Sequence, residues 1–125
     1  MRRLHVLLVE NDDDARTLYG FMLVKSGFQV TAVKNGFEAL AVMQEQRPNL
    51  VITDLAMPVL SGVELIKLIR NRDDYADIPM IAMTAHGEKI RRLATAAGAN
   101  KAMDKPISEG EMCEAIDIVL SHRED

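Results

Sequence analysis

The sequence predicts an α/β protein of three layers, in which helices cover both faces of a parallel sheet. Short apolar runs alternate with longer stretches of helical period, and this alternation is typical of repeated strand–helix units. Four of the runs are apolar nearly throughout, as expected of strands that helices cover on both sides. Five strands and five helices account for the whole length of 125 residues. We therefore expect a single domain over residues 1–125, with a core from about residue 4 to 121.

The elements follow from the apolar runs and their boundaries. The expected strands are Leu4–Val9, Phe28–Val33, Leu50–Thr53, Ile78–Met83 and a weaker Ala99–Met103. The expected helices are Asp13–Ser26, Gly36–Gln46, Ser61–Asn71, Gly87–Ala97 and Ser108–Ser121. Gly27 and Gly98 end two of these helices, and Ser61 is a candidate N-cap for the third. Gly62, close after Pro58, is expected where the chain turns or where backbone segments approach closely.

Composition excludes several classes of protein. Fifteen Lys and Arg residues against nineteen Asp and Glu give a net charge of −4, which lacks the basic surplus of a nucleic-acid-binding domain. The single Cys113 cannot form an internal disulfide, and one Cys with three His argues against a structural zinc site. The apolar runs are too short for a membrane span or a signal peptide. We expect a cytoplasmic protein with no membrane or direct nucleic-acid partner.

Polar residues stand where the expected strands end. In a parallel sheet all strand carboxyl ends lie along one edge, and ligands bind there near the switch in strand order. Carboxylates at that edge can hold a hard cation, while an ammonium and a hydroxyl can donate to an anion. This set fits Mg²⁺ together with a phosphoryl group. The residues expected at the edge are Glu10, Asn11, Asp12, Asp54, Thr84 and Lys105.

Four motifs occur in order at these ends: VEND followed by DDAR, then VITDLAMPVLSG, IPMIAMTA and MDKPI. From about Leu4 to Ser121 the chain resembles the response-regulator receiver domain. The resemblance implies a flavodoxin-like sandwich with strand order 2-1-3-4-5. It also implies that Asp54 accepts a phosphoryl group from a phosphohistidine of a sensor histidine kinase or phosphotransfer protein. Such a domain switches a protein-binding surface for a downstream target, which the sequence does not name.

The resemblance assigns roles to individual residues. Lys105 and Thr84 are expected to assist Asp54, and the Lys105–Pro106 peptide is expected to be cis. Mg²⁺ is expected to bind the residues at Glu10, Asn11 and Asp54 and the backbone carbonyl of Ala56, with Asp12 as a further candidate ligand. Such a domain promotes its own phosphorylation and dephosphorylation but does not turn over an external substrate. We expect a monomer or weak dimer.

Two positions depart from the family pattern. Asn11 stands where receivers usually place a metal-binding carboxylate, so we expect weaker Mg²⁺ binding. Ala102 stands where receivers often carry an aromatic switch residue. These departures leave a second hypothesis open, a receiver-like interaction module that is not phosphorylated. An aspartyl-phosphate phosphatase is disfavoured because Ala56, two residues after Asp54, cannot act as an acid.

The first helix predicts a partner surface. An inward face is expected to hold Ala15, Leu18, Tyr19, Met22 and Leu23. Phe21 and Val24 fall outside that stripe, beside Gly20, on the expected solvent face. They form either an ordinary exposed pair or a docking patch for a helix of the phosphotransfer partner. Separately, His86 lies two residues after Thr84, where it either affects water access to the site or is an exposed loop residue.

Overall fold

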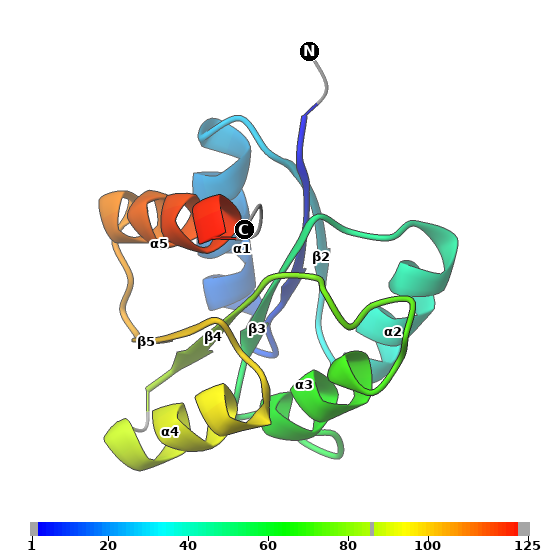
Figure 1. Ribbon diagram of the computed structural model, residues 1–125. Coiled ribbons are helices and arrows are strands. Elements are labelled where there is room, and N and C mark those ends of the chain that lie inside the picture. Colours follow the sequence, from blue (N-terminus) through cyan, green and yellow to red (C-terminus); the bar gives the residue numbers. More distant parts are fainter. Residues whose placement is uncertain (1–2, 86, 123–125) are drawn as a thin grey trace.

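Five parallel strands form the central sheet of the computed structural model, which describes residues 3–85 and 87–122 (Figure 1). The strands are β1 (His5–Val9), β2 (Gln29–Val33), β3 (Leu50–Asp54), β4 (Met80–Thr84) and β5 (Lys101–Asp104). Their order across the sheet is β2-β1-β3-β4-β5, so the predicted order is confirmed. The candidate residue His86 lies outside the described residues.

Helices connect the strands and cover both faces of the sheet. They are α1 (Asp13–Lys25), α2 (Gly36–Glu45), α3 (Gly62–Arg70), α4 (Glu88–Ala97) and α5 (Glu109–His122). These bounds differ from the expected ones by one or two residues. The largest shifts are at the starts of β4 and β5. At β5 the cap of α4 extends through Ala99, whose N–H donates to Ala94 O. Within residues 3–85 and 87–122, no helix has the length and apolar character needed to cross a membrane.

Two apolar cores lie on opposite sides of the sheet. Helices α1 and α5 cover one face, where Leu8 and Ile52 are fully buried. Helices α2, α3 and α4 cover the other face, where Leu7 and Val51 are fully buried. Because side chains alternate between the faces of a strand, neighbouring residues of β1 serve different cores. The predicted three-layer architecture is confirmed.

Strand β2 is less buried than its sequence suggested. Its residues Gln29 and Ala32 are exposed, and only Val33 is buried. The strand stands at the edge of the sheet and pairs with β1 alone. The prediction of burial on both faces was therefore wrong for this strand.

The buried face of α1 is narrower than predicted. Tyr19 and Leu23 are buried, whereas Leu18 is half exposed, at 50%. Consecutive helix residues are separated by about 100° around the axis, so Leu18 turns away from the face that Tyr19 presents. Gly20 lies toward the sheet instead, since a Cβ there would stand 3.9 Å from Leu8. Leu18 therefore belongs to the solvent face, and Gly20 does not.

Arg70, the last residue of α3, joins three segments on the α3 and α4 side. Its guanidinium donates to the carbonyl oxygens of Ala76, Ile78 and Gly98, at 3.0, 2.7 and 3.0 Å. It also donates to Asn100 Oδ1 at 2.9 Å. Burial lowers the pKa of Arg70, although the charge of a nearby aspartate opposes this effect. One side chain thus holds the carboxyl end of α4 against α3.

Candidate functional site

Glu10 and Asp54 come together at the switch in strand order. Glu10 follows β1, and Asp54 ends the neighbouring strand β3. From β1 the chain continues to β2 on one side, and from β3 it continues to β4 and β5 on the other. Both residues are buried, with exposed fractions of 0% and 5%. Two carboxylates thus share a recess from which most water is excluded.

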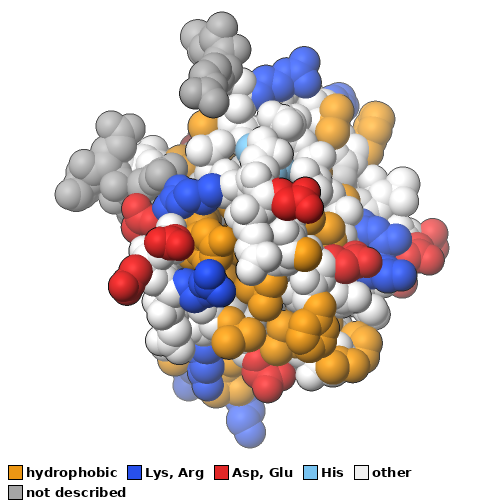
Figure 2. Space-filling model, turned by 90° about the vertical axis from the view of Figure 1, so that its right-hand side faces the viewer, with side chains coloured by type: hydrophobic (Ala, Val, Ile, Leu, Met, Phe, Trp, Pro, Cys, Tyr) orange, Lys and Arg blue, Asp and Glu red, His pale blue; other side chains and the backbone are white. Residues whose placement is uncertain are grey.

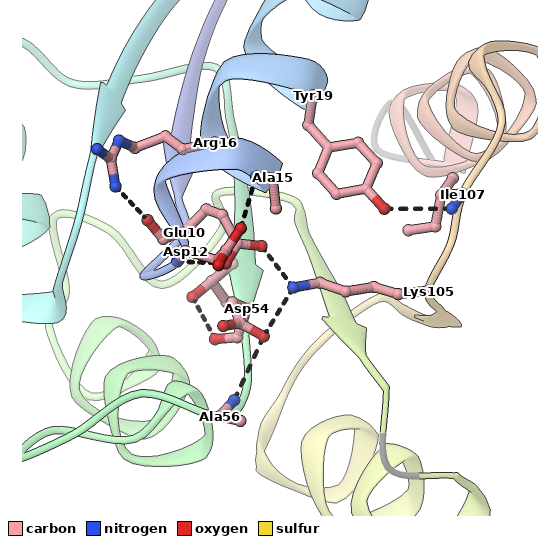
Figure 3. Close-up of polar contacts among 10 residues, drawn as sticks. Glu10, Asp12, Ala15, Arg16, Tyr19, Asp54, Ala56, Lys105 and Ile107 are labelled. Atoms are coloured by element: carbon pink, nitrogen blue, oxygen red, sulfur yellow. Dashed lines mark hydrogen bonds and ion pairs between the residues drawn. The ribbon is translucent and has the colours of Figure 1, made fainter.

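Lys105 links the two carboxylates. Its Nζ lies 2.5 Å from Glu10 Oε1 and 3.3 Å from Asp54 Oδ1 (Figure 3). The backbone N–H of Lys105 donates to Thr84 O at 2.8 Å, which fixes where the side chain starts. The Lys105–Pro106 peptide is cis, as the family resemblance implied. The ammonium therefore points from the β5 edge to the centre of the site.

Burial and charge act in opposite directions on this pair. Burial raises the pKa of Glu10, although its hydrogen bonds to Lys105 and to the backbone of Asp12 lower it in part. Burial alone would lower the pKa of Lys105. The hydrogen bond to Glu10 and the charges of Asp54 and Glu10 outweigh it, so the pKa of Lys105 is raised. The two carboxylates that face Lys105 thus favour its charged form.

The second carboxylate oxygen and the backbone oxygen of Glu10 hold the loop after β1. Glu10 Oε2 accepts from Asp12 N at 3.0 Å, and Arg16 Nη1 donates to Glu10 O at 3.0 Å. Asp12 is the N-cap of α1, where its Oδ2 accepts from Ala15 N at 2.8 Å. One carboxylate oxygen of this candidate metal ligand is thus engaged by the helix. Arg16 was not predicted, since its role depends on a backbone oxygen that no sequence pattern reveals.

The Asp54 carboxylate is fixed through one of its oxygens. Ala56 N lies 3.4 Å from Asp54 Oδ1, the same oxygen that faces Lys105. Behind it, Gly62 permits the close approach that its position predicted. A Cβ at Gly62 would stand 2.3 Å from Asp54 O and 2.6 Å from Leu55 Cα, a contact that only glycine avoids.

Thr84 completes the row of strand ends. It is the last residue of β4, is fully buried, and stands opposite Asp104 in the register with β5. Ala102, two residues before Asp104, is half buried and packs against the core on the α4 side. The structure thus brings Glu10, Asp54, Thr84 and Lys105 to one edge.

Asn11 lies at the rim of the site. It is exposed and borders a shallow depression of about 200 Å³. The depression carries an apolar rim that the sequence did not predict, and apolar surface gathers in the lower half of Figure 2. The other residues around it are Lys34, Asn35, Phe37, Pro58 and Val59. Val59 is 89% exposed, with a left-handed φ of 70°.

The recess fits a hard divalent cation. Its donors are oxygens, and the two carboxylates of Glu10 and Asp54 carry one more negative charge than Lys105 neutralises. Within the described ranges, no group of three or more His, Cys, Asp or Glu side chains is placed to hold a metal. Asn11, the residue after Glu10, carries an amide and adds no negative charge to these two carboxylates.

A family model supplies the deciding comparison. The model of the response regulator receiver domain matches residues 6–117. The chain belongs to the response regulator receiver domain family. It is 33% identical over 116 residues to the polar-differentiation response regulator DivK of Brucella anthropi, covering 89% of this chain and 91% of that protein. It is also 33% identical to the phosphate regulon regulator PhoB of Rhizobium meliloti, covering 92% of this chain and 51% of PhoB.

Solved receiver domains share the fold. Chemotaxis response regulator CheY4 of Vibrio cholerae superimposes with a TM-score of 0.88 at 27% identity, covering 94% of this chain and 99% of that one. The receiver domain of sensor histidine kinase PA1611 of Pseudomonas aeruginosa gives a TM-score of 0.88 at 28% identity, covering 96% and 99%. That structure has a magnesium ion coordinated in its active-site cleft. This receiver domain is therefore a signalling module of the two-component type.

Proposed function

We propose that this receiver domain accepts a phosphoryl group on Asp54. The observation that carries the proposal is the buried triangle of Asp54, Glu10 and Lys105, in which one carboxylate is held by an ammonium 3.3 Å away. Such a carboxylate is oriented for attack on phosphorus, and the cation beside it can balance the charge that arrives with the phosphoryl group.

The proposed transfer forms one O–P bond and breaks one P–N bond. A carboxylate oxygen of Asp54 attacks the phosphorus of a phosphohistidine, and an acyl phosphate forms. The P–N bond breaks, and its electron pair returns to the imidazole nitrogen of the donor. Lys105 donates to the oxygens of the incoming group, and Thr84 at the end of β4 is positioned to do the same. The partner is a sensor histidine kinase or a histidine phosphotransfer protein.

Mg²⁺ fits the remaining donors. Glu10, Asp54, Asn11 and the backbone carbonyl of Ala56 would hold it, with Asp12 as an additional candidate. When bound, the cation neutralises phosphoryl oxygens and reduces the repulsion between them and the carboxylates. Asn11 supplies a neutral carbonyl oxygen, so the unphosphorylated site attracts the cation less strongly than a site with three carboxylates.

The response to phosphorylation passes through α4. An acyl phosphate adds acceptor oxygens beside Thr84, and a hydrogen bond to Thr84 draws the segment leading to α4 inward. Ala102 cannot follow this movement as an aromatic ring would. We propose that shifts of the backbone and of α4 change the protein-binding surface. The domain thus acts as a switch in the cytoplasm, without turnover of an external substrate.

The donor is proposed to dock on α1. Phe21 and Val24 are 65% and 55% exposed, as predicted, and Leu18 joins them on the solvent face. The three residues are spaced three apart, and they form an apolar strip on the helix that follows the Glu10 loop. A helix of the phosphohistidine protein packed on this strip would bring its histidine toward Asp54.

Intact mass measurement after incubation with acetyl phosphate and Mg²⁺ tests the proposal. The wild type is expected to gain the mass of one phosphate, and Asp54→Ala is expected to gain none. Asp14→Ala, which removes an exposed carboxylate at the start of α1, is the matched control and should be labelled like the wild type. Full labelling of Asp54→Ala would move the acceptor to another carboxylate. An unlabelled wild type would favour an interaction module that is not phosphorylated.

A further inference from the structure

A second polar recess lies at the opposite end of the sheet from Asp54. It is a cavity of about 420 Å³ at the amino ends of β1, β2 and β3, beneath the carboxyl end of α2. The length of a five-residue strand, about 13 Å, separates the two edges. The cavity is lined by Arg3, His5, Gln29, Gln46, Arg47 and Asn49.

Every lining side chain carries nitrogen, and no carboxylate is among them. Arg3 has no hydrogen bond or ion pair within residues 3–85 and 87–122, so its guanidinium is available. Arg47 donates through Nε to Asp74 O at 3.1 Å and through Nη2 to Asp77 Oδ1 at 2.5 Å. Its Nη1 takes part in neither contact. The lining therefore offers donors in excess of acceptors.

The amide of Asn49 adds to this excess. Its acceptor oxygen is already used, because His5 N donates to Asn49 Oδ1 at 2.7 Å. Asn49 N in turn donates to His5 O at 2.8 Å, so the two residues are fixed against each other. The NH₂ group of the Asn49 side chain remains available to donate to a ligand.

His5 carries an unsatisfied polar atom at this cavity. The residue is only 3% exposed, and its Nδ1 is buried without a partner among the described residues. Its Nε2 lies 2.8 Å from Thr31 Oγ1. The Thr31 hydroxyl can donate to Nε2 or accept from it, and with either tautomer the buried Nδ1 is closed off from a molecule in the cavity. The His5 ring therefore lines the cavity as a fixed wall, and the contacts to a ligand fall to the guanidinium and amide groups around it.

We propose that this cavity binds a small molecule that carries a phosphate or carboxylate group. The guanidinium groups of Arg3 and Arg47 and the amide of Asn49 present donors, and an oxyanion accepts several hydrogen bonds at once. This proposal does not depend on phosphorylation of Asp54. The ligand would bind at the edge of the sheet opposite the one that meets the phosphoryl donor.

The test is a titration of ¹⁵N-labelled protein followed by NMR, with inorganic phosphate in one arm and citrate in the other. Sodium chloride holds the ionic strength constant in both arms. Saturable shifts are expected for the backbone amides of His5, Gln29 and Asn49 and for the His5 ring nitrogens. In Arg3→Gln the affinity should fall by about ten-fold, the loss of one charge-assisted contact. Arg92→Gln, the same change of charge on exposed α4, should leave it within about two-fold.

Each result of the titration either supports the proposed anion site or overturns it. Saturation by phosphate alone or by citrate alone assigns the class of the ligand, and saturation by both assigns a general oxyanion site. Shifts that do not saturate, or that are equal in Arg3→Gln and wild type, overturn the proposal. So do shifts confined to Asp54, Thr84 and Lys105, since they would place the anion at the other edge of the sheet.

Discussion

Tyr19 Oη accepts a hydrogen bond from Ile107 N at 3.2 Å, across a separation of 88 residues. Both residues are buried, at 3% exposure each. The bond ties α1, which follows the Glu10 loop, to the segment that follows Lys105. Two parts of the site that are far apart in the chain are thus fixed relative to each other through one hydroxyl group.

Tyr19→Phe is expected to lower the free energy of unfolding by about 1–3 kcal/mol, because the buried Ile107 N–H loses its acceptor. Urea denaturation measures the change. Tyr75→Phe is the matched control, since it alters a ring of similar burial that lies beside Arg72 and away from the site. Equal destabilisation by the two variants would mean that the Tyr19 bond has no special value.

Asn11→Asp is expected to tighten Mg²⁺ binding, because it adds one negative charge at the rim of the recess. Titration with Mg²⁺, followed by chemical shifts around Asp54, gives the dissociation constant. We expect a decrease of about ten-fold. An unchanged or larger dissociation constant would show that Asp12 already supplies the charge or that Asn11 lies outside the cation's ligands.

Phe21→Ser is expected to slow phosphotransfer from the phosphohistidine partner by about ten-fold, since an exposed aromatic anchor is lost. The rate with acetyl phosphate should not change, because the site itself is intact. Leu68→Ser on α3, where the side chain is 44% exposed, is the control and should leave both rates unchanged. An equal partner rate for Phe21→Ser and wild type eliminates the docking role.

Stability should fall as the pH drops below about 6.5. Burial lowers the pKa of His5 in the folded protein, so the unfolded chain binds a proton more readily. The contribution of His5 is fully present above the unfolded pKa of about 6.5 and is lost as the pH falls toward the folded pKa. Urea midpoints at about pH 7.5 and 5.5, in buffers free of phosphate and carboxylate, should differ more for the wild type than for His5→Gln. Equal pH dependence would contradict this.

Much of the site was predictable because parallel topology carries residues far apart in the chain to one edge. Asp54 and Thr84 end their strands and Lys105 follows β5, so their convergence at one edge follows from the parallel direction of the strands. Leu18 was misplaced because periodicity gives the spacing of a buried stripe but not its width. The hydrogen bond between Tyr19 and Ile107 could not be predicted, because the sequence pattern places Tyr19 on the buried face but does not show which group its hydroxyl contacts.

The contacts of Arg70 determine how α4 can move. Its hydrogen bonds to Gly98 O and Asn100 Oδ1 anchor the end of the helix and the loop after it, and its other two bonds hold the segment before β4. The amino end, in contrast, begins at Gly87 with no side-chain cap in the described structure. Nearer that end, α4 is held by the partly exposed ion pair of Arg91 with Asp104, a type of contact that contributes about 0–1 kcal/mol. If phosphorylation displaces Thr84 as proposed, we expect α4 to rotate about its anchored carboxyl end. Its first turn would then move further than the residues near Gly98.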